Sequence, residues 1–173
     1  FHPGMFRAWW GAGVSALTGR AERLGTGDRP WEAAAINLLP TVLQSPNEAR
    51  AALVDALLLV HCPSRDVTGE AMRNLVHAAR HDRALWSAKA LAQQRAVSPR
   101  TSQREFLEFV GIGPKWVAQR YRVQAAIDVL DAERLGTGER GDLTQLALDL
   151  GYYDLAHFSR DFRTVTGYSP DRY

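Results

Sequence analysis

The stretch from Leu143 to Pro170, LTQLALDLGYYDLAHFSRDFRTVTGYSP, limits what this chain can fold into more than any other. Its apolar residues begin at the spacing i, i+3, i+4 and i+7, which predicts a short amphipathic helix. These residues are Leu143, Leu146, Ala147 and Leu150. Gly151 then favours a helix end in the left-handed conformation, and Asp154 can cap a second helix by accepting a hydrogen bond from its first-turn amides. The stretch therefore predicts two short helices joined by a tight turn.

The second of these helices is predicted to have an apolar face and a polar face. Leu155, Phe158 and Phe162 share the apolar face. The side chains that project elsewhere belong to Ala156, Ser159, Arg160 and Arg163. A short helix, a turn and a second helix with polar side chains form a helix-turn-helix, whose second helix can enter a DNA major groove.

The same residues carry a resemblance to a known family. The run G-Y-x-D-x-x-H-F-S-R-x-F, followed by G-Y-S-P, resembles the signature of AraC/XylS-type transcription regulators. The matching residues are Gly151, Tyr152, Asp154, His157, Phe158, Ser159, Arg160, Phe162, Gly167, Ser169 and Pro170. So many matches at fixed spacing are a specific signal, unlike a single short motif. The resemblance implies a domain of two helix-turn-helix units that binds double-stranded DNA, with RNA polymerase as a candidate further partner.

A second copy of the pattern precedes this one, at residues 85–111. Ser87 and Ser98 are each placed to cap a short helix, and residues 95–97 form the turn between the two helices. Four pairs of identical residues recur at one constant offset along the chain, namely Arg104 and Arg160, Phe106 and Phe162, Gly111 and Gly167, and Pro114 and Pro170. An internal repeat at a fixed offset is better evidence than either motif alone.

A long helix from Pro114 to about Leu135 is predicted between the two copies. At 1.5 Å per residue it would span roughly 33 Å. One turn of B-DNA advances about 34 Å. A connecting helix of this length would place two reading helices in successive major grooves on one face of the duplex.

The candidate DNA-contacting residues lie on the second helix of each copy. They are Arg100, Thr101, Gln103 and Arg104 in the first copy, and Leu155, Ala156, His157, Ser159, Arg160 and Arg163 in the second. Arginine can read guanine and glutamine can read adenine through paired hydrogen bonds, whereas Leu155 and Ala156 offer only apolar contact. The second copy is therefore expected mainly to position the protein through Arg160 and Arg163. For Arg104 and Arg160 the alternative role is a structural ion pair.

The distribution of charge supports DNA binding more than the net charge of +2 does. Residues 85–122 hold seven basic and two acidic side chains, whereas residues 123–161 hold three basic and eight acidic ones. Attraction to phosphate is therefore expected mainly on the first of these segments. The acidic excess of the second segment motivates an alternative function, a helical protein-interaction module without DNA binding.

The predicted fold is mainly all-α, with three parts. Residues 1–30 begin with FHPGMFRAWWGAG, which has no helical period, and we expect a short non-helical remnant of an N-terminal sensor-type domain. Residues 31–83 are expected to form a helical connector, in which Pro40 and Pro63 end two of the helices. Its helices are expected at 31–39, at 45–61 with Ser45 as the cap, and at 68–81. The DNA-binding domain is expected at 84–173, with helix-turn-helix units at 85–111 and 142–167 and a linker helix at 114–135.

Other functional classes find little support in the sequence. No Ser-His-Asp spacing, phosphate loop or pair of catalytic carboxylates is evident, so no enzyme and no cofactor are predicted. Cys62 is the one cysteine, which excludes an internal disulfide and fits a reducing cytoplasm. His77 and His81 lie at i and i+4 but lack a third zinc ligand, so we interpret them as solvent-facing. The longest apolar run, Ala56 to Val60, is too short to cross a bilayer. We therefore expect a cytoplasmic regulator with no metal and no membrane partner, for which a second copy of the chain is a candidate partner and the effector is unidentified.

Overall fold

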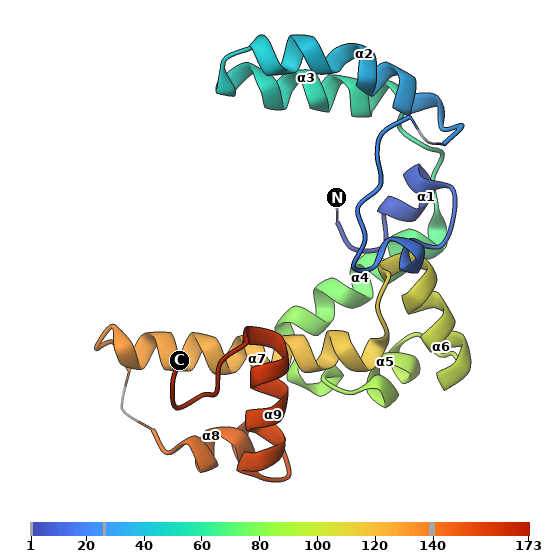
Figure 1. The fold of residues 1–173 in the computed structure, drawn as a ribbon. Coiled ribbons are helices and arrows are strands. Elements are labelled where there is room, and N and C mark those ends of the chain that lie inside the picture. The colour runs from blue at the N-terminus through green and yellow to red at the C-terminus, as the bar shows by residue number, and fades with distance from the viewer. Residues whose placement is uncertain (1, 26, 139–140) are drawn as a thin grey trace. The chain divides into compact units, whose positions relative to one another are not determined.

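The computed structural model describes residues 2–25, 27–138 and 141–173, and within these ranges every regular element is helical (Figure 1). The prediction of an all-α fold is confirmed. The elements are α1 (Phe6–Trp10), η1 (Val14–Leu17), α2 (Pro30–Gln44), α3 (Asn47–Val60), α4 (Val67–His81), η2 (Arg83–Leu85), α5 (Ala88–Gln94), α6 (Pro99–Glu105), η3 (Phe106–Val110), α7 (Pro114–Arg134), α8 (Leu143–Asp149) and α9 (Leu155–Thr166).

The chain forms two compact units. The first comprises Phe1–Asn74 and Arg104–Ile112, and the second comprises Leu75–Gln103 and Gly113–Tyr173. Helices α4 and α6 each begin in one unit and end in the other. The division into three domains that the sequence suggests stays a prediction, and each unit is described by itself below.

In the first unit, α2 packs against α3. Pro40 lies inside α2, so the expectation that it ends the helix is wrong. A proline in a helix interior costs about 3 kcal/mol, because it removes one backbone hydrogen bond and crowds the preceding turn, so this part of α2 is a weak point of the helix. The expected cap of α3 is also wrong, since the Ser45 hydroxyl donates to the Thr41 carbonyl at 2.7 Å and no side chain caps α3.

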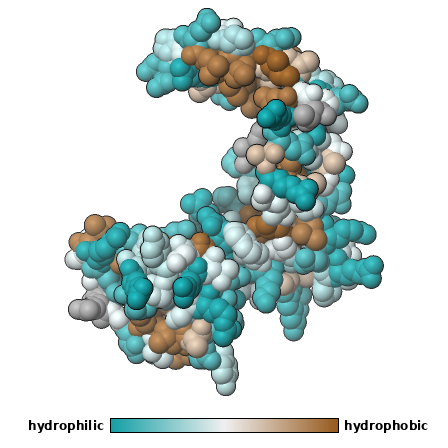
Figure 2. Space-filling model, viewed as in Figure 1, coloured by the Kyte–Doolittle hydropathy of each residue, from teal (hydrophilic) through white to brown (hydrophobic). Residues whose placement is uncertain are grey.

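The faces of α2 and α3 carry apolar side chains that the unit leaves exposed, and they form the apolar surface over these helices in Figure 2. The exposed residues include Ile36, Leu39, Leu43, Val54, Leu59 and Val60. No residue of α3 is buried, and α2 buries only Glu32, which bonds to Arg29. The pair therefore has almost no core of its own.

The N-terminal segment is more ordered than its sequence predicts. Residues Phe6–Trp10 form α1, so the expectation of a non-helical start is wrong. The reason is tertiary contact, which no helical period reveals. The Arg7 Nε donates to Glu108 Oε1 at 2.8 Å, and its guanidinium lies 4.9 Å from the centre of the Phe109 ring. The Thr18 hydroxyl donates to the Gly111 carbonyl at 2.6 Å.

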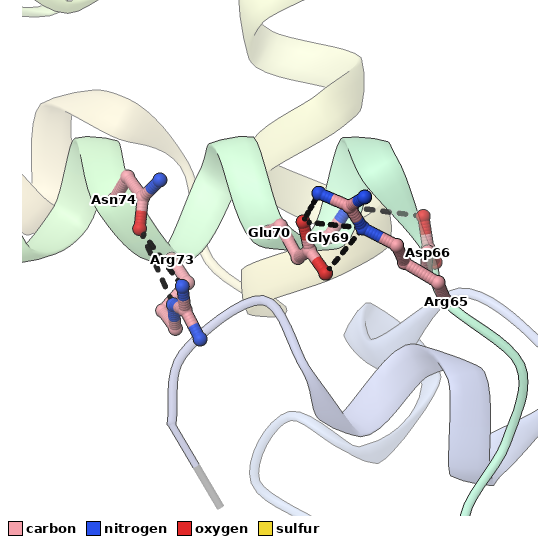
Figure 3. Close-up of polar contacts among 6 residues, drawn as sticks. All are labelled: Arg65, Asp66, Gly69, Glu70, Arg73 and Asn74. Atoms are coloured by element: carbon pink, nitrogen blue, oxygen red, sulfur yellow. Dashed lines mark hydrogen bonds and ion pairs between the residues drawn. The ribbon is translucent and has the colours of Figure 1, made fainter.

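Helix α4 begins with polar contacts between residues that are close in sequence (Figure 3). The Asp66 Oδ1 accepts a hydrogen bond from the Gly69 amide at 3.0 Å and so caps the first turn. The Arg65 Nη2 lies 2.8 Å from Glu70 Oε2, and this hydrogen bond lowers the pKa of the Glu70 carboxyl. Because both groups of this pair face solvent, the contact orients the start of α4 and adds little stability.

A hydrophobic cluster holds the second helix-turn-helix against α7 in the second unit. Its buried members are Trp86, Val123, Ala126, Ala147, Leu150, Tyr152, Phe158 and Phe162. They come from the chain before α5, from α7, and from α8, α9 and the turn between them. The predicted core positions Phe158 and Phe162 are confirmed, since neither ring is exposed.

Trp86 connects three parts of this unit. Its indole Nε1 donates to the Ala79 carbonyl of α4 at 2.9 Å. Its own carbonyl accepts a hydrogen bond from the Arg122 guanidinium of α7. The same guanidinium lies 4.7 Å from the centre of the Tyr152 ring, in the turn between α8 and α9. This row of contacts joins α4, α7 and the second helix-turn-helix.

The two helix-turn-helix copies use the same capping chemistry but differ in turn length. Ser87 and Asp142 cap the first helices, and Ser98 and Asp154 cap the second helices, as predicted for Ser87, Ser98 and Asp154. The caps of the second helices share the offset of the repeat, whereas the caps of the first helices are closer together in the chain by one position. The turn of the second copy is therefore longer by one residue.

The second residue after the first helix is left-handed in both copies. Gly151 has φ 77°, and Ala96 has φ 53°. Ala96 is the one non-glycine residue with positive φ in the described part of the chain. An L-residue with a Cβ is strained there, because its Cβ approaches the following carbonyl oxygen. The first copy therefore carries a strain that glycine relieves in the second.

Exchanging the two residues tests this difference. Ala96→Gly should raise the free energy of unfolding by about 1 kcal/mol, and Gly151→Ala should lower it by about the same amount, as measured by urea denaturation. A Cβ added at Gly151 would have no heavy atom within 4 Å, so its effect comes from the backbone. Ala90→Gly, inside α5, is the control and should cost about 1 kcal/mol. A destabilising Ala96→Gly would contradict the assignment.

Candidate nucleic-acid interface

The polar face of α6 is exposed at the positions chosen from the sequence. Arg100, Gln103 and Arg104 lie at i, i+3 and i+4, and all three side chains are exposed. Among the described residues, the guanidinium groups of Arg100 and Arg104 have no hydrogen bond and no ion pair. The structural ion pair considered for Arg104 therefore has no support in this part of the chain. Both groups are available to a ligand.

Thr101 and Gln103 are held by neighbouring groups. The Thr101 hydroxyl lies 2.9 Å from the Ser98 hydroxyl and belongs to the cap of α6. The Gln103 side chain lies over Gly113, where an added Cβ would be 3.0 Å from its Nε2. Glycine at residue 113 thus makes room for Gln103 beside the start of α7. The two polar side chains are positioned by the fold rather than extended freely.

Ser102 lies on the opposite, buried face of α6. It is 1% exposed, and its hydroxyl has no hydrogen-bond partner in the described residues. At the offset of the repeat, the position that corresponds to it in the second copy is Phe158, which is fully buried. Serine thus occupies a core position that holds a phenyl ring in α9. An unpaired buried hydroxyl costs about 1–3 kcal/mol. The buried face of α6 therefore stabilises the fold less than the buried face of α9 does.

Helix α9 exposes the equivalent face. Ala156, Arg160 and Arg163 are exposed and Ser159 is half-buried. At the offset of the repeat, Ala156, Ser159 and Arg160 correspond to Arg100, Gln103 and Arg104. The guanidinium groups of Arg160 and Arg163 have no hydrogen bond and no ion pair in the described part of the chain. Both arginines are therefore as available to a ligand as the pair on α6.

His157 and Leu155 make contacts within the second unit. The His157 Nε2 lies 3.8 Å from Asp161 Oδ2, and its ring meets the Tyr152 ring edge-on at 5.2 Å between centres. Leu155 is half-buried and packs against the hydrophobic cluster. These two side chains orient the start of α9.

Tyr152 lies at the base of this surface. Its ring is 3% exposed, and its hydroxyl has no hydrogen-bond partner among the described residues. Burial raises the pKa of this hydroxyl, and the Asp161 carboxylate raises it further, while the positive charge of Arg122 acts in the opposite direction. The neutral hydroxyl is therefore the form that the fold favours.

The comparison with known families agrees with this geometry. Residues 91–173 match a protein-family model described as a helix-turn-helix domain. This region is an AraC-type helix-turn-helix domain. No curated protein and no solved structure matches the chain. The resemblance of the signature to AraC/XylS regulators is thus confirmed, and the match includes both copies of the motif from Leu91 onwards.

The AraC-type domain indicates the general function of residues 91–173. Domains of this kind bind DNA and regulate transcription, and they are not a catalytic family. None of the described helices is long and apolar enough to cross a membrane. The rings of His77 and His81 lie 5.0 Å apart between centres, tilted by 54°, and in the described residues they have no third His, Cys, Asp or Glu to complete a metal site.

The sequence missed one residue that shapes the AraC-type domain. Arg122 counts among the basic residues of the segment 85–122, yet its guanidinium is half-buried between the Trp86 carbonyl and the Tyr152 ring. Its acceptor lies 36 residues earlier in the chain. No local pattern indicates this contact, so only the structure separates Arg122 from the arginines that face solvent.

The buried Tyr152 hydroxyl should make the stability of the fold depend on pH. A tyrosine in the unfolded chain loses its proton near pH 10, and the raised pKa of Tyr152 means that the folded state keeps it. The unfolded state then binds fewer protons, so stability should fall as pH rises above about 10. Tyr152→Phe should lose less stability over this range in urea denaturation at several pH values. Tyr153→Phe, at a ring that is 88% exposed, is the matched control and should behave like the parent chain.

Proposed function

We propose that the chain is a sequence-specific DNA-binding transcription regulator in which α6 and α9 enter successive major grooves of one duplex. The observation that carries the proposal is the pair of equivalent exposed faces. Each face presents two arginines without a partner in the described residues, Arg100 and Arg104 on α6 and Arg160 and Arg163 on α9. Arginines placed in this way can bind phosphates and the edges of guanine.

The two helices are proposed to contribute differently. Arg100, Gln103 and Arg104 give α6 three long side chains that can hydrogen-bond to bases. At the equivalent positions α9 has Ala156 and Ser159 before Arg160, so it offers fewer base contacts. Helix α6 therefore reads sequence, and α9 fixes the register on the duplex through phosphate contacts. Thr101, Leu155 and His157 are proposed to contribute mainly by shaping these helices.

The length of α7 supports simultaneous binding. Its 21 residues span about 32 Å at 1.5 Å per residue, which is close to one turn of B-DNA. Both α5, the first helix of copy one, and α9 contact α7. A single helix thus supports both helix-turn-helix units. One chain would occupy a site that other helix-turn-helix proteins occupy as dimers.

Further partners belong to the same proposal. Residues 84–173 would bind DNA, and residues 1–30 and 31–83 would be a sensor-type segment and its helical connector. A second copy of the chain would bind at the exposed apolar faces of α2 and α3, and RNA polymerase would be contacted from the DNA-bound state. We propose no catalytic step.

DNA binding is tested by selecting duplexes from a random pool with the full chain and titrating the best duplex against a scrambled one. The selected duplex should bind more tightly, and the logarithm of its affinity should fall with the logarithm of the salt concentration at a slope of several units, because bound counterions are released. Equal affinity for both duplexes, or no binding to either, would favour the protein-interaction module suggested by the acidic residues after Val123.

Two variants distinguish base-specific contacts on α6 from phosphate contacts on α9. Arg104→Ala should weaken binding to the selected duplex by about 1–3 kcal/mol and leave the scrambled duplex less affected. Arg163→Ala should weaken both duplexes alike and reduce the salt slope by about one unit. Arg65→Ala removes the same charge from an exposed pair outside the proposed interface and should change neither affinity. Unchanged binding by Arg104→Ala would remove this residue from the interface.

A further inference from the structure

A cavity of about 500 Å³ lies in the second unit, and none of its lining residues belongs to α6 or α9. It opens between the C-terminal end of α4, Trp86 and the middle of α7. Its volume is within the range of small-molecule sites in proteins, about 300–1,000 Å³. The DNA-binding proposal uses none of its lining residues.

The charges in the cavity favour an anion. Arg80, His81 and Arg120 line it, and Asp128 is its one acidic residue. In the described part of the chain, neither Arg80 nor Arg120 has a hydrogen bond or ion pair, although Arg120 lies 5.7 Å from the centre of the Trp116 ring. The two arginines and Asp128 together give the lining one net positive charge. A ligand with a single negative group would balance it.

The two arginines line the same cavity as Tyr121. Burial raises the pKa of the Tyr121 hydroxyl, and the charges of Arg80 and Arg120 both act against this rise. Arg80 belongs to α4 and Arg120 to α7, so two helices each contribute a guanidinium group to the lining of the cavity. Such converging donors suit a carboxylate, whose two oxygens each accept charge-assisted hydrogen bonds.

The helix dipole explains the positions of Arg80 and His81 but not that of Arg120. Arg80 and His81 lie in the last turn of α4, where basic side chains stabilise a helix by complementing its dipole. Arg120 lies in the second turn of a 21-residue helix, far from the C-terminal end that would attract a cation. The helix dipole therefore does not account for Arg120, nor for the cavity between the two arginines.

The opposite end of the cavity has different chemistry. Asp128 is two turns further along α7 than Arg120, about 12 Å at 1.5 Å per residue. Its Oδ1 accepts one hydrogen bond, from Gln124 Nε2 at 3.1 Å, so its other oxygen can accept from a ligand. The rings of Trp86 and Tyr121 and the methyl group of Ala125 line the cavity as well.

We propose that this cavity binds a small monocarboxylic acid whose carboxylate lies between Arg80 and Arg120, whose apolar body lies along Trp86 and Tyr121, and whose far end donates a hydrogen bond to Asp128. The site does not depend on DNA binding, because it is defined and tested without DNA.

The test is calorimetric titration of the full chain with three matched probes. 3-(4-Hydroxyphenyl)propionate has a carboxylate and a hydroxyl at opposite ends, its amide lacks the charge, and 3-phenylpropionate lacks the hydroxyl. The hydroxy acid should bind saturably, 3-phenylpropionate more weakly and the amide not measurably. Inorganic phosphate is a fourth probe without an apolar body. If phosphate binds as tightly as the hydroxy acid, or if the hydroxy acid does not bind, the proposal is wrong.

Variants place the binding in the cavity. Arg80→Gln and Arg120→Gln should each weaken the hydroxy acid by about tenfold or more, because each removes hydrogen bonds to a charged group. Arg134→Gln removes the same charge from an exposed residue further along α7 and should leave affinity within about twofold. Asp128→Asn should remove the preference for the hydroxy acid over 3-phenylpropionate. Equal losses in all three arginine variants would show nonspecific attraction and overturn the site.

Discussion

The second unit depends on the contacts of Trp86 and Arg122. The Trp86 ring donates a hydrogen bond to α4, and its carbonyl accepts one from the Arg122 guanidinium, which also lies over the Tyr152 ring. Hydrogen bonds to charged groups are worth about 1.5–3 kcal/mol each, and more is lost when a buried partner is left unpaired. The Arg122 Nε has no hydrogen-bond partner in the described residues. The guanidinium is therefore held by the hydrogen bond to the Trp86 carbonyl and by the Tyr152 ring.

The orientation of the proposed reading surface follows from this core. Phe158 and Phe162 are fully buried in the cluster that Trp86 completes, and they lie one helical turn apart on α9. Burying this face fixes the rotation of α9 about its axis, so Arg160 and Arg163 must project outwards. The Asp154 cap sets where the helix begins. Packing and capping together thus decide which side chains can meet a ligand.

The features that the sequence predicted well are those made by residues close together in the chain. Ser87, Ser98 and Asp154 bond to amides within the next three residues, and Gly151 ends its helix alone, so their signals are local. The ordered N-terminal segment and the half-buried Arg122 depend on partners 101 and 36 residues away. Pro40 lies inside α2, although proline is a local signal for the end of a helix. The DNA-contacting roles stay predictions. Exposure of these side chains shows that a ligand can reach them, but it does not show which ligand they bind.

The contacts of Arg7 and Thr18 affect which fragment of the chain can be expected to fold by itself. The segment that the family match includes contains Glu108 and Gly111, but the groups that satisfy them come from the first eighteen residues. Excising that segment at its homology boundary would strip the Glu108 carboxylate of its guanidinium and leave the Gly111 carbonyl to water. A homology boundary and a folding boundary therefore do not coincide in this chain.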